Sequence, residues 1–412
     1  MTSRQRHFDS EKEQRKIKSV ALMKKIMKKY YFRAKTAKWR GKKVAWITSG
    51  GPVEPLIAMD VIPVYPENHG AMIGATKMGV ELCEKSEAMG YSRDLCSYAR
   101  SDIACSVVKG GPIGGLPRPD FLVCCTNICG TVLKWYEVQA RHYNVPLFIL
   151  DTPFIHAEMT EEAVRYVKHQ MHDYIKFLEQ TCKKRCNDDK FQKVGQLSIQ
   201  AQHLWQDILD CCAHKPAPMT AFDAFFHLAL IVTLRGTETV VDYYRELLSE
   251  MRERIATGIS MVPDEKIRLL WDNIPIWFRT RWLSNKFSEH NACLVADTYT
   301  SAWSGVVHLI DENNLLDSMA VAYSNVHLNV SIDRMFEKMK SLIEKYHVDG
   351  VVMHSNRSCK PYSFGQYDLQ KMIRDKLNIP TLILEADMVD ERDFSESQIE
   401  SRIDAFMEIF RA

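Results

Sequence analysis

The chain has 412 residues, of which 46% are hydrophobic and 26% are charged, and its formal net charge is +2. This length predicts two or three domains with sizeable cores, and the composition is typical of a soluble globular protein. No apolar run is long enough to cross a bilayer, and the first residues lack the apolar core of a secretory signal. We therefore expect a cytoplasmic protein without a membrane partner.

The positive charge is concentrated at the N-terminus, where residues 1–43 contain 16 Lys or Arg and three acidic residues. We expect residues 1–42 to form a basic helical arm. Its apolar residues recur at helical spacing: Val20, Met23, Ile26, Met27 and Tyr30. One interpretation is docking on an acidic partner or on phosphates, and the other, which we favour, is a helix that packs along the body. Because no nucleic-acid-binding motif accompanies the charge, we expect no nucleic-acid partner.

Short apolar runs alternate with amphipathic helices in residues 43–157 and again in residues 291–412. The predicted strands lie near residues 44–48, 121–125, 146–151, 292–296, 350–354 and 380–384. This alternation predicts an α/β protein with two doubly wound parallel-sheet domains of the flavodoxin or Rossmann kind. Long helical patterns and few strand signals predict a mainly helical domain between them, over residues 158–290.

The two α/β regions follow the same order along the chain. Each has a strand that enters a cysteine-bearing turn, then a helix, then a strand that opens with proline and leads to aspartate, over residues 146–151 and 380–387. We interpret this order as a diverged internal duplication. Two facing halves would bring the carboxyl ends of their strands to one cleft, where open α/β sheets bind ligands.

Three of the twelve cysteines, Cys96, Cys129 and Cys359, lie in polar turns before predicted helices. Three thiolates gathered at strand ends suit an iron–sulfur cluster with one metal position left open. Their spacing matches no compact ferredoxin or zinc-finger motif, so a metal-free binding protein with packing thiols is also compatible with the spacing. Cys125 is the alternative ligand to Cys129, because it lies only four positions before Cys129 in the same motif. The two form a C-x-x-x-C pair that would suit one helix face. Six others are expected to be structural: Cys83, Cys182, Cys186, Cys211, Cys212 and Cys293.

Two further residues are candidates for chemistry. Pro63 and Pro66 predict a turn that displays Glu67 on a loop, where partial burial would suit the carboxylate to proton transfer. The other interpretation is a surface carboxylate without a catalytic role. Ser49 follows the first predicted strand and precedes two glycines, in a turn that offers a hydroxyl and N–H groups to a carbonyl. Nicotinamide chemistry, ATP hydrolysis in this chain and serine hydrolysis lack their motifs.

Several segments in this order resemble the 2-hydroxyacyl-CoA dehydratase and benzoyl-CoA reductase superfamily. They are Tyr-Pro-Glu-Asn at 65–68, residues 90–100 around Cys96, residues 124–129 with Lys-Trp-Tyr-Glu at 134–137, and Asn-Arg-Ser-Cys-Lys at 356–360. The resemblance runs from about residue 43 to the C-terminus and includes residues 387–392 and 395–398. Within the superfamily, these forms are most similar to the α-type subunit of (R)-2-hydroxyacyl-CoA dehydratases. The basic arm has no place in the family pattern.

The resemblance implies a [4Fe-4S] cluster held by Cys96, Cys129 and Cys359, with one iron site not bound by cysteine. It implies an acyl-CoA substrate in a site lined by Ser49 and Glu67, a second related iron–sulfur subunit, and an ATP-dependent iron–sulfur activator. The implied reaction removes water from a 2-hydroxyacyl-CoA to give an enoyl-CoA. An injected electron converts the thioester into a ketyl radical that expels the α-hydroxyl. Ser49 would donate a hydrogen bond to the thioester oxygen, and Glu67 would move the proton.

Two other functions share parts of this chemistry. A subunit of an ATP-dependent benzoyl-CoA (aryl-CoA) reductase would use the same cluster and activator, and a non-catalytic electron-transfer protein would use the cluster alone. Pairing with a different subunit and pairing with a second copy are both compatible with the sequence. Four basic residues are candidate neighbours of phosphates or of the cluster, with simple ion pairing as the other interpretation: Arg100, Lys134, Arg357 and Lys360.

Overall fold

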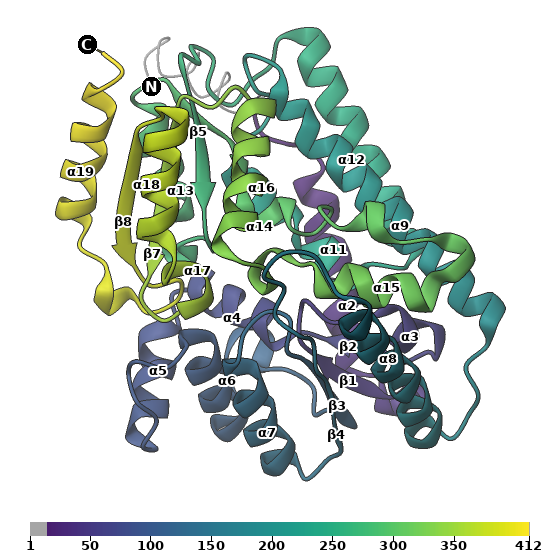
Figure 1. Ribbon diagram of the computed structural model, residues 1–412. Coiled ribbons are helices and arrows are strands. Elements are labelled where there is room, and N and C mark those ends of the chain that lie inside the picture. Colours follow the sequence, from purple (N-terminus) through teal and green to yellow (C-terminus); the bar gives the residue numbers. More distant parts are fainter. Residues whose placement is uncertain (1–14, 412) are drawn as a thin grey trace.

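A computed structural model describes residues 15–411. It contains two four-stranded parallel sheets, and Figure 1 shows the half around the first sheet, in purple and blue, below the half around the second, in green and yellow. The first sheet has the order β2-β1-β3-β4 and consists of β1 (Val44–Ile47), β2 (Ile62–Val64), β3 (Phe121–Cys125) and β4 (Leu147–Leu150). The second has the order β6-β5-β7-β8 and consists of β5 (Ile267–Asp272), β6 (Ala292–Asp297), β7 (Gly350–Asn356) and β8 (Thr381–Ala386). The predicted α/β class with two parallel sheets is confirmed.

Both sheets have the same strand order. In each half the second strand pairs on one side of the first, and the third and fourth lie on the other side. The direction of winding therefore reverses between β1 and β3 and between β5 and β7, and ligands of open α/β sheets bind at such reversals. This shared order is what an internal duplication predicts.

Three of the strands are buried on both faces. All residues of β1, β3 and β6 are buried, which is why each is a continuous apolar run without polar alternation. Successive side chains point to opposite faces, so Trp46 and Leu122 lie in one core and Ile47 and Val123 in the other. Each core also contains residues of the second sheet, so the two halves are packed together.

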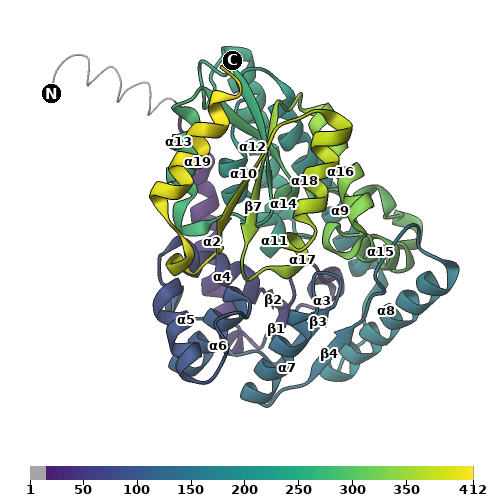
Figure 2. The same cartoon turned by 60° about the vertical axis from the view of Figure 1, so that its left-hand side comes forward.

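Helices cover both sheets and fill the space beside them. The first half contains α2 (Val20–Lys35), α3 (Glu54–Ala58), α4 (Pro66–Ala75), α5 (Gly79–Ala88), α6 (Ser97–Val108) and α7 (Thr131–Tyr143). Between the sheets in sequence are α8 (Glu161–Cys182), α9 (Asp188–Asp210), α10 (Ala221–His227), α11 (Ala229–Leu234) and α12 (Glu238–Thr257). The second half contains α13 (Thr280–Ser288), α14 (Thr298–Ser301), α15 (Leu315–Ser324), α16 (Ile332–Lys345), α17 (Lys360–Ser363), α18 (Gln366–Leu377) and α19 (Glu396–Glu408). Figures 1 and 2 both place α4 and α17 at the junction of the halves.

Two strands and one helix correct the sequence analysis. Strand β5 lies inside residues 158–290, which were expected to be mainly helical, so the second sheet begins before residue 291. Its apolar run is short and is flanked by charged residues, so the pattern of apolar residues does not indicate a strand there. Strand β2 was missed because it contains Pro63, which an edge strand tolerates. Glu67 is not on a loop, because Pro66 begins helix α4.

The N-terminal helix α2 packs on the body. It buries Met23, Tyr30, Tyr31 and Ala34, while Lys24, Lys25, Lys28 and Lys29 are exposed. The Tyr30 hydroxyl donates to the Pro63 carbonyl at 2.7 Å, and Asn68 Nδ2 donates to the Tyr31 hydroxyl at 2.8 Å. The packing interpretation is therefore confirmed for this helix, while residues 1–14 of the predicted arm lie outside the described residues. No helix in the described part of the chain has the length and apolarity needed to cross a membrane.

Close packing at the junction of the halves predicts that a methyl group added at Gly79 lowers the stability of the fold. Gly79, the first residue of α5, lies so close to Val389 of the second half that a Cβ would overlap the Val389 carbonyl oxygen. We expect Gly79→Ala to lower the free energy of unfolding by about 1–3 kcal/mol, measured by denaturant unfolding. Gly130→Ala is the matched control at another helix start, since no atom lies within 4 Å of the point where its Cβ would stand. Equal stability of both variants would contradict this close contact.

Candidate active site between the two halves

A cavity of about 170 Å³ lies where the carboxyl ends of both sheets meet. It is lined by five residues that the sequence singles out: Ser49, Glu67, Cys96, Cys129 and Cys359. Ser49 follows β1, Cys129 follows β3 and Cys359 follows β7, so three of the five lie just beyond strands at the points where the winding reverses. The fold thus brings residues from both ends of the chain to one cavity.

Each cysteine of the cavity stands at the start of a helix. Cys96 is the N-cap of α6, Cys359 is the N-cap of α17, and Cys129 precedes the N-cap of α7. Backbone N–H groups of the following residues point at the sulfur atoms and lower the thiol pKa values: Tyr98 and Ala99 at Cys96, Thr131 and Val132 at Cys129, and Tyr362 at Cys359. Such N–H groups stabilise the thiolate form, which is the form that binds metals.

Burial has the larger, opposite effect on these thiols. It raises the pKa of Cys96 to about 12 and raises the pKa values of Cys129 and Cys359. Cys129 adds to the rise at Cys96, and both of these thiols add to the rise at Cys359. All twelve cysteines are free. Without a metal the three thiols are therefore protonated at neutral pH, and a bound metal would displace their protons.

Cys125 stands apart from this group. It is the last residue of β3, is fully buried in a hydrophobic core and does not line the cavity. Its backbone N–H donates to Thr48 Oγ1 at 2.9 Å. The expectation that Cys125 and Cys129 share one helix face is wrong, because one ends a strand and the other lies in the turn that follows.

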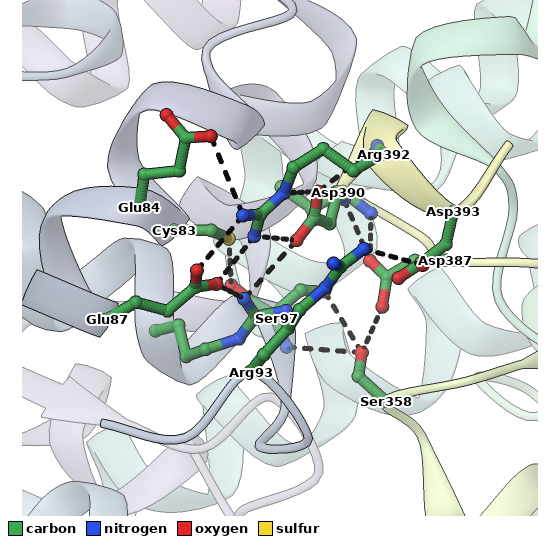
Figure 3. A network of polar contacts seen from close by, with 12 residues as sticks. Cys83, Glu84, Glu87, Arg93, Ser97, Ser358, Asp387, Asp390, Arg392 and Asp393 are labelled. Atoms are coloured by element: carbon green, nitrogen blue, oxygen red, sulfur yellow. Dashed lines mark hydrogen bonds and ion pairs between the residues drawn. The ribbon is translucent and has the colours of Figure 1, made fainter. Parts of the chain in front are cut away.

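Hydrogen bonds across the junction hold Cys96 and Cys359 in place. The N–H of Ser97 donates to Ser358 Oγ at 3.2 Å, and Ser358 Oγ donates to Asp387 Oδ2, as Figure 3 shows. Asp387 is itself fixed by the N–H groups of Val389 and Asp390, at 2.7 and 2.8 Å from Oδ1. Because Ser97 follows one cysteine and Ser358 precedes the other, this chain of bonds ties the two halves together at the site.

An ion-pair network continues from these bonds. Arg100, which is 1% exposed, pairs with Glu87 and with Asp390 at 3.3 Å, and its Nε donates to the Leu95 carbonyl at 3.0 Å. Arg392 pairs with the same two carboxylates, and these partners hold the pKa values of Glu87 and Asp390 below their ordinary values, against the opposing effect of burial. The contacts of Arg100 are therefore ion pairs and a hydrogen bond within the junction of the halves.

The other candidate phosphate neighbours are also paired. Lys134 pairs with Glu137 at 2.8 Å and Arg357 pairs with Glu385 at 3.1 Å. Lys360 donates to the carbonyl of Arg357. None of the three lines the cavity, and the ion-pair interpretation describes the observed contacts of Lys134 and Arg357.

Glu67 and Ser49 are in direct contact. Glu67 lies in the first turn of α4 and is 8% exposed. Its Oε1 accepts a hydrogen bond from the Ser49 N–H at 3.1 Å, and its Oε2 accepts one from the Tyr136 hydroxyl at 3.2 Å. Burial raises the pKa of Glu67 to about 7, although these hydrogen bonds lower it. A carboxyl with such a pKa can both hold and release a proton at neutral pH.

Sequence reasoning missed a buried network at the cavity wall. Arg235 Nε pairs with Glu54 Oε1 at 3.2 Å, and its Nη2 donates to the Gly51 carbonyl at 3.2 Å and to the Tyr323 hydroxyl at 3.0 Å. Tyr323 in turn donates to Glu54. The contact with Gly51 holds the turn that begins at Ser49. No local pattern marks these residues, since their partners are more than 80 positions away in sequence.

The donor set of the cavity fits an iron–sulfur cluster. Among residues 15–411, no group of three His, Cys, Asp or Glu is close enough to hold a single metal ion. In a cluster each cysteine binds a different iron, so the thiols stand further apart than the ligands of one ion. Thiol sulfurs are soft ligands that select such clusters over hard cations. Buried amide atoms without a protein partner, at Asn127 and Asn356, lie close in sequence to Cys129 and Cys359.

The chain is similar to known proteins over nearly its whole length. Residues 48–410 match the family model of the 2-hydroxyglutaryl-CoA dehydratase, D-component. The chain is 34% identical to the (R)-phenyllactyl-CoA dehydratase alpha subunit of Clostridium sporogenes, over 98% of each chain. It is 36% identical to the (R)-2-hydroxyisocaproyl-CoA dehydratase alpha subunit of Clostridioides difficile, over 93% of this chain and 94% of that one. It is 25% identical to a benzoyl-CoA reductase chain of Thauera aromatica, over 96% and 95%.

The Arg235 network predicts a large effect on stability. We expect Glu54→Gln to lower the free energy of unfolding by about 3–5 kcal/mol, because it leaves a buried guanidinium without its counter-charge. Glu137→Gln is the control at a partly exposed ion pair, where solvent screening makes the expected change small. Denaturant unfolding of both variants measures the difference. A loss in Glu54→Gln no larger than in the control would contradict the buried pair.

The environment of Glu67 predicts an unusual titration. Because burial disfavours the charged form, Glu67 should stay protonated at pH 5–6, where an ordinary carboxyl is ionised, and lose its proton as the pH rises through about 7. Infrared difference spectra between the native protein and Glu67→Gln isolate this carboxyl from the other buried ones. A midpoint near the ordinary value of about 4.3 would show that the site is open to water.

Proposed function

We propose that this chain carries the iron–sulfur active site of a radical (R)-2-hydroxyacyl-CoA dehydratase. The chain belongs to the 2-hydroxyglutaryl-CoA dehydratase D-component family and is of the α-subunit type. The enzyme is a hydro-lyase. Its net reaction is redox-neutral: the α-hydroxyl and one β-hydrogen leave as water, and a double bond forms between the two carbons. The observation that carries the proposal is the gathering of Cys96, Cys129, Cys359, Ser49 and Glu67 around one cavity.

Cys96, Cys129 and Cys359 would hold a [4Fe-4S] cluster with one iron free of cysteine. When bound, the cluster supplies a single electron and a Lewis acid to the thioester carbonyl, so that the substrate passes through a ketyl radical. The two halves of the chain each provide part of this ligand set. Closing the site between the halves would keep water away from a reactive substrate.

Ser49 would bind the thioester oxygen. It lies at the cavity, and its N–H is already bonded to Glu67 at 3.1 Å, so its hydroxyl is the group left to donate to the substrate. A hydrogen bond to an oxygen that gains negative charge stabilises it by about 1.5–3 kcal/mol. The Arg235–Gly51 contact positions this turn.

Glu67 would move the proton. The hydroxyl of Tyr136 and the N–H of Ser49 hold this buried carboxyl in position. Its pKa is raised to about 7 by burial. It would take the β-proton and deliver a proton to the departing hydroxyl. The two transfers return Glu67 to its starting state.

Two partners are part of the proposal. The relatives are named alpha subunits, which supports a related second subunit for this chain, with an iron–sulfur cluster of its own. The chain has no nucleotide-binding glycine motif, so ATP-driven electron injection would come from a separate iron–sulfur activator.

Turnover by the reconstituted complex tests the proposal. With its partner subunit, the activator, ATP and a reductant, the chain should convert a 2-hydroxyacyl-CoA into the enoyl-CoA under anaerobic conditions. We expect Ser49→Ala to lower kcat/KM about 10- to 100-fold and Glu67→Gln to lower it about 10²- to 10⁴-fold.

The controls are Ser401→Ala and Glu137→Gln at exposed or partly exposed helical positions, which should keep full activity. Reduction of benzoyl-CoA in place of dehydration would establish the aryl-CoA reductase. If the cluster accepts electrons but neither thioester is converted, the function that remains is that of a non-catalytic electron-transfer protein.

A further inference from the structure

One part of the cavity wall is mainly apolar. It comes from the segments around η5 (Val307–Leu309) and η7 (His327–Asn329). Its hydrophobic members line the cavity from these two segments: Ala302, Trp303, Val306, Ile310, Val326 and Leu328. A substrate held at the cysteines would therefore meet aliphatic and indole surfaces on this side.

The positive charge at the cavity is already matched. Arg235 is the only Lys or Arg among the described residues that line it. Its guanidinium pairs with Glu54, donates to Gly51 and Tyr323, and lies 5.5 Å from the ring centre of Trp303. Both charges of the Arg235–Glu54 pair are nearly fully buried. Arg235 thus has no free charge for a further carboxylate.

His327 supplies hydrogen-bonding capacity without charge. Its ring lies in the wall beside Tyr362, and its Nε2 is buried without a partner among the described residues. Burial lowers the pKa of His327 to about 3, and the nearby Lys338 adds to this effect. A neutral imidazole can contact a polar atom of the substrate, but it cannot balance a carboxylate.

We infer that the acyl group of the substrate has an uncharged hydrophobic side chain, either branched aliphatic or aromatic, and that carboxylate-bearing acyl groups are rejected. This inference rests on the proposed function and adds the substrate class. A buried carboxylate is stable only when it is paired. Arg235, the one Lys or Arg among the described residues that line the cavity, is already paired with Glu54. Lys338, which lies near His327, donates to the Asn325 carbonyl and does not line the cavity. The wall around Val306 and Trp303 then determines specificity.

Binding of unreactive acyl-CoA analogues to the anaerobically purified full chain tests the inference. Calorimetry should show 4-methylpentanoyl-CoA and 3-phenylpropanoyl-CoA binding about tenfold or more tightly than glutaryl-CoA. Glutaryl-CoA that binds as tightly as the hydrophobic analogues would overturn the inference and leave the proposed function standing. If no analogue binds more tightly than CoA alone, the acyl site itself is refuted, and the proposed function fails with it.

A variant at the wall tests the assignment of Val306, which is half-buried. Val306→Arg adds a free cation and should improve glutaryl-CoA binding about tenfold while weakening 4-methylpentanoyl-CoA binding. Val306→Leu is the matched control and should keep the native preference. An unchanged preference in Val306→Arg, with a native thermal unfolding midpoint, would show that this wall does not contact the acyl chain.

Discussion

The hydrogen bonds of Ser358 are the constraint on which the site depends. Its hydroxyl accepts from the N–H of Ser97 and donates to Asp387, so the turns that carry Cys96 and Cys359 are joined directly. Each half supplies too few thiols for a cluster by itself. Around these bonds, Arg100, Arg392 and their carboxylate partners lock the halves together in a buried ion-pair network. The candidate site thus depends on the junction of the halves.

Burial explains how one cavity can hold both a thiol set and a proton carrier. Desolvation raises the thiol pKa values and brings the pKa of Glu67 to about 7, while nearby N–H groups limit both effects. The one Arg that lines the described cavity is neutralised by Glu54, so it neither ionises the thiols nor attracts acids. Under the proposed function, the same low polarity that shifts these pKa values would also select the acyl side chain.

Strands and cysteine-bearing turns could be predicted from the sequence where neighbouring residues form a clear pattern. Continuous apolar runs mark β3 and β7, and polar cysteine-bearing turns after them mark Cys129 and Cys359. Pro63 hid strand β2, and the flanking charges hid β5. Pro66 was interpreted as a turn residue although it begins α4, so Glu67 was expected on a loop. Contacts such as Arg235 with Glu54 join residues 181 positions apart, and no local pattern predicts which of the many buried pairs will meet.

Iron and acid-labile sulfide content of the anaerobically purified chain, with electron paramagnetic resonance after reduction, tests the central claim most directly. We expect about four irons and four sulfides per chain. Cys96→Ser, Cys129→Ser and Cys359→Ser should lose them, and Cys125→Ser, whose side chain lies in the core, should keep them. Protein that is free of iron under strict anaerobiosis, or a cluster that is lost in Cys125→Ser and kept in Cys129→Ser, would contradict the account.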